Sequence, residues 1–83
     1  MTEGRQKKVI IYTASTCPWC AKTKALLDGK GIMYTNYDVL QDRERAREMV
    51  EISGQRSVPV ILIDGQMVIG YNPQKIEELL NTA

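Results

Sequence analysis

The chain has 83 residues, and its 11 lysines and arginines against 10 aspartates and glutamates give a formal net charge of +1. A charge so close to zero provides no electrostatic basis for binding nucleic acid or a membrane surface. No apolar run approaches the roughly 20 residues of a membrane-spanning helix, and the length predicts a single small domain over residues 1–83.

The first half of the chain predicts a strand, a helix and a second strand. Residues 8–12 form a short β-branched run, which is typical of a buried central strand. A helix can begin at Pro18, and apolar residues follow at helical spacing until Gly29 and Gly31 favour its end. Residues 33–39 alternate in polarity, which predicts the second strand.

The second half predicts a helix, a hairpin and a last helix. Asp42 can cap a helix that ends at Gly54. Two apolar runs at residues 60–63 and 66–69 are separated by an Asp-Gly dipeptide, which is typical of a two-residue hairpin. The last helix follows Asn72, with proline at its first position. The order β-α-β-α-β-β-α predicts a four-stranded mixed sheet flanked by three helices, the first and third sharing a face.

Cys17 and Cys20 are the only cysteines in the chain, and they stand where the first strand gives way to the first helix. Unpaired N–H groups and the helix dipole stabilise a thiolate at a helix start, which makes Cys17 the predicted nucleophile. Cys20, one turn further on, can resolve a mixed disulfide formed on Cys17. Lys22 and Lys24 either add positive potential or are simply solvated.

Three other interpretations of the cysteine pair are weaker. A structural disulfide would close a very short loop and gain little stability. A zinc site needs four ligands, and this chain offers two cysteines and no histidine. Chance pairing in the core does not explain Pro18 and Trp19 between the cysteines at a helix start. Because the N-terminus is polar, we expect a cytoplasmic protein, in which thiols are reduced and such a pair is catalytic.

The sequence resembles the glutaredoxins, a family of the thioredoxin-fold superfamily, over nearly its whole length. The resemblance rests on three motifs: Cys17-Pro18-Trp19-Cys20, Ser57-Val58-Pro59, and Gly70-Tyr71 before the last helix. It implies an α/β thioredoxin fold and a thiol–disulfide oxidoreductase. It also implies a cis peptide bond at Pro59 facing the cysteines and a backbone contact from Val58 to a bound peptide or glutathione. We expect no tightly bound cofactor and no metal.

Several further residues are expected to line a groove for glutathione or a peptide. Trp19 has no obvious core role at a helix start, so we expect an exposed ring that contacts substrate, whereas Tyr12 is expected in the core. Arg56, beside the Ser-Val-Pro motif, can meet a carboxylate of the ligand. The remaining walls are expected to be Gly70, Tyr71 and Asn72, where the last helix begins and an anion can bind.

Two departures from the family pattern leave the reductant open. Many glutaredoxins carry a basic residue three positions before the first cysteine, where this chain has Ala14, and the stretch 69–73 lacks the usual second glycine and acidic residues. These features resemble glutaredoxin-like redoxins that serve ribonucleotide reductase and are recycled by thioredoxin reductase. In a third alternative, Cys17 from each of two chains binds an iron–sulfur cluster. We expect a monomer that reduces protein disulfides, with glutathione as co-substrate or thioredoxin reductase as partner.

Overall fold

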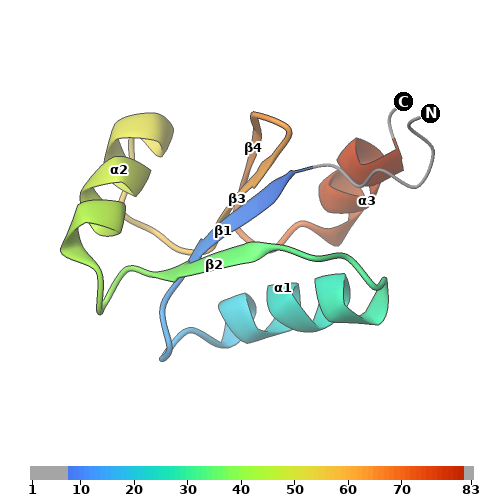
Figure 1. Cartoon of the computed structure of the whole chain (residues 1–83), viewed down its shortest axis with the longest axis horizontal. Coiled ribbons are helices and arrows are strands. Elements are labelled where there is room, and N and C mark those ends of the chain that lie inside the picture. The colour runs from blue at the N-terminus through green and yellow to red at the C-terminus, as the bar shows by residue number, and fades with distance from the viewer. Residues whose placement is uncertain (1–7, 82–83) are drawn as a thin grey trace.

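A computed structural model describes residues 8–81, which form a mixed sheet flanked by helices (Figure 1). In chain order the elements are β1 (Val9–Thr13), α1 (Pro18–Gly29), β2 (Thr35–Asp38), α2 (Arg43–Ser53), β3 (Val60–Ile63), β4 (Gln66–Ile69) and α3 (Pro73–Asn81). The predicted element order is confirmed. The second strand was predicted at residues 33–39, and β2 is shorter at both ends. Met33 lies before it, outside the sheet, and is 77% exposed. None of the helices described here is long and apolar enough to cross a membrane.

The strand order in the sheet is β2-β1-β3-β4, with β1 parallel to β2 and antiparallel to β3. Because β1 and β3 run in opposite directions, the end of one strand lies beside the start of the other, and Tyr12 pairs with Val60. The loop that follows β1 carries Cys17, and Val58 and Pro59 directly precede β3. Strand pairing therefore brings two motifs that are far apart in the sequence to the same end of the sheet.

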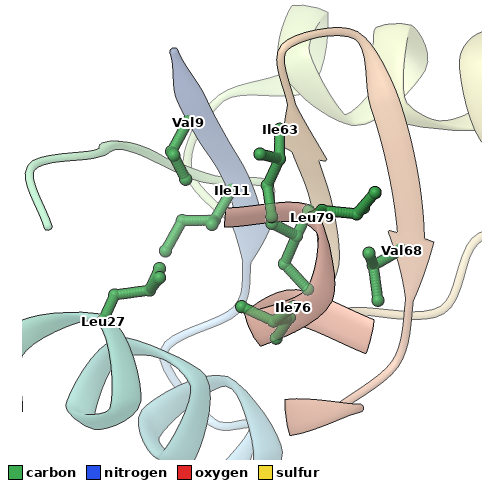
Figure 2. Close-up of a cluster of buried hydrophobic side chains, with 8 residues drawn as sticks. Val9, Ile11, Leu27, Ile63, Val68, Ile76 and Leu79 are labelled. Carbon is green, nitrogen blue, oxygen red and sulfur yellow. The ribbon is translucent and has the colours of Figure 1, made fainter. Parts of the chain in front are cut away.

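Helices α1 and α3 pack on one face of the sheet, as predicted, and α2 packs on the other. Figure 2 shows Leu27 of α1 and Ile76 of α3 directed toward side chains of β1 and β3. On the opposite face, Met49 of α2 packs with Tyr12 and Val60. Strand β1 is covered on both faces, which explains why its sequence lacks alternation. The buried residues on the face covered by α1 and α3 are Val9, Ile11, Leu27, Ile61, Ile63, Val68, Ile76 and Leu79.

The predicted helix caps are confirmed. The side chain of Asp42 accepts the N–H of Arg45 at 3.2 Å, which satisfies one of the unpaired donors at the start of α2. Asn72 does the same for α3 by accepting the N–H of Lys75 at 3.1 Å. The helix before the Val58-Pro59 segment (α2) and the helix after β4 (α3) thus begin at fixed positions.

The hairpin between β3 and β4 is also confirmed, and its turn consists of Asp64 and Gly65. Their φ angles are +50° and +85°, as a mirror-image two-residue turn requires. The Asp64 carboxylate accepts the N–H of Lys8 at 2.8 Å, which connects the turn to the residue before β1.

A polar network joins α2 to the central strand. The buried Tyr12 hydroxyl donates to Glu48 Oε2 at 2.7 Å, and Arg45 Nη1 donates to Glu48 Oε1 at 2.7 Å. The Arg45 guanidinium lies 4.2 Å from the centroid of the Tyr37 ring. Burial, followed by the hydrogen bond to Glu48, raises the pKa of Tyr12. Tyr12 is a core residue, as expected, and its hydroxyl ties α2 to β1.

Candidate active site

Cys17 is the N-cap residue of α1, with an extended backbone and with Pro18 at the first helical position. Its Sγ accepts the backbone N–H of Cys20 at 3.2 Å, and its own N–H donates to the Ala14 carbonyl at 3.0 Å. The first turn of α1 contains no acidic side chain. The Cys20 N–H and the positive end of the helix dipole therefore face this sulfur, with no acidic side chain in the same turn.

Cys20 is fully buried, whereas Cys17 is partly exposed, and both are free thiols. Burial, followed by the hydrogen bond with Cys17, raises the pKa of Cys20 to about 12. Cys20 therefore keeps its proton near neutral pH. The two thiols differ in the way that a dithiol mechanism needs, with an accessible attacking sulfur and a sheltered, protonated resolving sulfur.

The Val58-Pro59 segment faces the first cysteine. The peptide bond between these residues is cis, as the resemblance implied. Cys17 Sγ lies 3.9 Å from the Val58 carbonyl oxygen. The Pro59 carbonyl in turn accepts the N–H of Gly70 at 2.8 Å, which connects this segment to the end of β4. Three separate parts of the chain thus meet beside the reactive sulfur.

A groove of about 290 Å³ opens at this junction. Trp19, which is 54% exposed, stacks against Tyr71, which lies between β4 and α3, with ring centroids 5.7 Å apart and planes inclined by 26°. The expected exposure of Trp19 is confirmed. The groove is lined by five of the residues predicted from the sequence, Trp19, Val58, Pro59, Gly70 and Tyr71.

Comparison with known proteins identifies the family that this geometry represents. The model of the family described as Glutaredoxin matches residues 9–68. This chain belongs to the glutaredoxin family. It is 43% identical, over 84% of its length and 93% of the relative's, to a protein of Clostridium pasteurianum described as an uncharacterized glutaredoxin-like 8.6 kDa protein in the rubredoxin operon. The family consists of thiol–disulfide oxidoreductases, so the expected enzyme class is confirmed.

Solved structures support the same assignment. The crystal structure of a glutaredoxin from Archaeoglobus fulgidus has a TM-score of 0.84 and 28% identity, covering 95% of this chain and 91% of that one. The Escherichia coli NrdH-redoxin, described as a glutaredoxin-like protein with a thioredoxin-like activity profile, has a TM-score of 0.78 and 26% identity, with coverage of 92% and 99%. The sheet and its three helices thus form a thioredoxin fold, as predicted.

In this glutaredoxin, two predicted binding residues lie outside the groove. Arg56 lines a second groove of about 400 Å³, whose other lining residues are Val39, Ala46, Arg47, Met49 and Val50. The Asn72 side chain caps α3, and Asn72 lines a third groove with other residues of that helix. Neither residue lines the groove formed by Trp19 and Tyr71, and their contribution to ligand binding stays a prediction.

One contact was not anticipated from the sequence. Lys22 Nζ lies 5.3 Å from the centroid of the Trp19 ring, in a cation–π arrangement. The sequence could have predicted this contact, because residues three apart on a helix are neighbours on its surface. Within residues 8–81, no cluster of three or more histidine, cysteine, aspartate or glutamate side chains could hold a metal ion.

Proposed function

We propose that this glutaredoxin reduces protein disulfides and glutathione mixed disulfides, with glutathione as its co-substrate and with no tightly bound cofactor. The observation that carries the proposal is the position of Cys17, whose sulfur caps α1 and lies 3.9 Å from the Val58 carbonyl oxygen beside an open groove. A substrate disulfide can approach Cys17 from this groove, with peptide groups next to the Val58 backbone. Since the reaction consumes thiols, we place it in the reducing cytoplasm.

The proposed reaction has two exchange steps. The Cys17 thiolate attacks one sulfur of the substrate, the Cys17–substrate disulfide forms, and the other substrate sulfur leaves as a thiolate. Cys20 then attacks Cys17 Sγ, its proton passes to the departing thiolate, and the Cys17–Cys20 disulfide remains. Two glutathione molecules return the pair to the dithiol and leave as glutathione disulfide. The buried Cys20 supplies its proton only in the second step, in keeping with its raised pKa.

The groove supports a peptide-like ligand. Its walls combine the aromatic residues Trp19 and Tyr71 with Val58, Pro59 and Gly70. Extended peptides are bound in proteins by main-chain hydrogen bonds with pockets for side chains. Glutathione, a tripeptide thiol, presents both kinds of group to such a surface.

An electron-source assay tests the proposal. The same disulfide substrate is supplied with NADPH and either glutathione with glutathione reductase or thioredoxin reductase, and NADPH oxidation is followed. Glutathione-dependent turnover that is lost in Cys17→Ser is the expected result. If a protein shown to be folded gives no turnover with either electron source, the assignment is contradicted.

A second reductant is favoured by a specific observation. Ala14 stands where many glutaredoxins have a basic residue. It is only 8% exposed, and its methyl side chain has no charge to offer a glutathione carboxylate. A charge-assisted hydrogen bond contributes about 1.5–3 kcal/mol. The similarity to NrdH-redoxin, which is described as having a thioredoxin-like activity profile, points the same way. Efficient reduction by thioredoxin reductase, with slow glutathione turnover, would favour a redoxin that serves ribonucleotide reductase.

A further inference from the structure

A cation lies beside the groove, and the proposed reaction does not use it. Lys22 lies on α1 one turn after Trp19, and its Nζ is 5.3 Å from the Trp19 ring centroid. Trp19 forms a wall of the groove. A lysine side chain has several freely rotating bonds, and the contact with the ring keeps the exposed ammonium near the groove.

The electrostatic surroundings leave this ammonium available to a ligand. The residues that line the groove carry no charged side chain. Between residues 8 and 81, no carboxylate forms an ion pair with Lys22, and the first turn of α1 contains no acidic residue. By contrast, Lys30 at the other end of α1 is paired with Glu77 at 3.3 Å. Lys22 is thus a cation without a carboxylate partner in this part of the chain.

We propose that Lys22 is a specificity-determining residue that favours disulfides carrying a carboxylate close to the reacting sulfur. The proposal rests on the disulfide-reductase function stated above and names the substrate class of the same site. A carboxylate that enters the groove beside Trp19 pairs with the Lys22 ammonium. Neutral disulfides gain nothing from this pairing, and cationic ones are repelled.

The alternative is that Lys22 only stabilises α1 through its contact with Trp19. A cation–π contact at an exposed site contributes about 0.5–1 kcal/mol to stability. Removing it would then lower the free energy of unfolding, and it would change the rates with all disulfides by the same factor. The ratio between an anionic and a neutral substrate distinguishes the two roles.

The test uses three small disulfides that differ in their end groups: dithiodipropionate (anionic), bis(hydroxyethyl) disulfide (neutral) and cystamine (cationic). Pre-reduced protein is mixed with each, the reaction is quenched with acid and an alkylating agent, and the oxidised fraction is measured by mass spectrometry. The quantity compared is the ratio of the second-order rate constants for the anionic and neutral substrates.

We expect Lys22→Gln to lower this ratio by about two- to fivefold, the factor that corresponds to an exposed ion pair. Lys22→Arg retains the wild-type ratio, because it keeps the cation. Lys22→Glu lowers the ratio further and raises the rate with cystamine relative to the neutral disulfide. Lys30→Gln changes the net charge by the same amount as Lys22→Gln, but at the far end of α1, and it leaves the ratio unchanged. The preference weakens at high ionic strength.

Two further substrate pairs show where the carboxylate comes from. A peptide disulfide with glutamate beside the cysteine is compared with its glutamine counterpart, and glutathione disulfide is compared with its glycine ethyl ester. A loss of discrimination in Lys22→Gln within the first pair assigns the preference to protein substrates, and within the second pair to glutathione.

The outcomes separate this proposal from the reductase function. If the wild type is oxidised by none of the disulfides, the proposed function fails. If it reacts with all three small disulfides and Lys22→Gln keeps the wild-type ratios, or if Lys30→Gln lowers the ratio equally, only the role of Lys22 is refuted.

Discussion

The Sγ atom of Cys17 lies 3.9 Å from the carbonyl oxygen of Val58, although 41 positions separate the two residues in the chain. The antiparallel pairing of β1 with β3 produces this proximity, because it places the loop after β1 beside the segment before β3. Both sides of the site are therefore anchored on the two central strands of the sheet. A thiol held in this way needs little rearrangement before it reacts.

The difference between the two thiols gives the first prediction. Near neutral pH, alkylation of the reduced protein labels Cys17 much faster than Cys20, because Cys20 is fully buried and its pKa is raised to about 12. Cys17→Ser abolishes disulfide exchange. Cys20→Ser keeps the first attack and accumulates a mixed disulfide on Cys17, since no internal thiol resolves it. Peptide mass spectrometry measures both labelling rates and the trapped adduct, and faster labelling of Cys20 would reverse the assigned roles.

Most of the fold was predictable from the sequence because its signals are local. Asp42 and Asn72 accept N–H groups of the helices that follow them, and Asp64 and Gly65 form the hairpin turn. Each of these residues determines the conformation of its own few neighbours, so no knowledge of the tertiary structure is needed to interpret it.

The walls of the groove were less predictable because they depend on the direction of side chains. Arg56 is two residues from Val58, yet the chain bends at Val58 and Arg56 lines a different groove. The Asn72 side chain is used by the cap of α3. Neighbours in sequence do not share a site where the chain turns between them, and Trp19 meets Tyr71 only through the packing of the whole sheet.

The aromatic wall gives the second prediction. Trp19→Ala removes a wall of the groove, and it lowers kcat/KM for disulfide substrates by about two- to tenfold, the factor that corresponds to losing a ring–substrate contact of roughly 0.5–1.5 kcal/mol. Trp19→Tyr retains a ring and most of the activity. Steady-state kinetics measures the effect. An unchanged kcat/KM in Trp19→Ala would show that the ring does not contact substrate.

The hydrogen bond between Tyr12 and Glu48 predicts that the free energy of unfolding depends on pH. Tyr12→Phe removes this hydrogen bond and lowers the free energy of unfolding by about 1 kcal/mol near neutral pH. The Tyr12 hydroxyl, followed by Arg45, lowers the pKa of Glu48 below its usual value of 4.5. A carboxylate with a lowered pKa stabilises the folded state above pH 4.5, and this contribution is lost as the pH falls through the folded-state value.

The stability difference between wild type and Tyr12→Phe should therefore shrink as the solution is acidified. Urea unfolding at a series of pH values measures it. Tyr37→Phe provides the control, because the contact of its ring with Arg45 does not require the hydroxyl. A difference that stays constant down to the acid transition would show that the ionised form of Glu48 is not the one that Tyr12 stabilises.

Two glycines with open surroundings predict opposite effects of the same substitution. A Cβ added at Gly65 or at Gly29 meets no atom within 4 Å, so packing does not distinguish the two positions. Gly65 has a φ of +85°, where an alanine costs about 1–2 kcal/mol, and Gly65→Ala should lower the free energy of unfolding by that amount. Gly29 lies in α1 with no such φ, and Gly29→Ala should raise the free energy of unfolding by about 0.5–1 kcal/mol. Chemical denaturation of both variants measures the pair, and equal signs would contradict the assigned turn geometry.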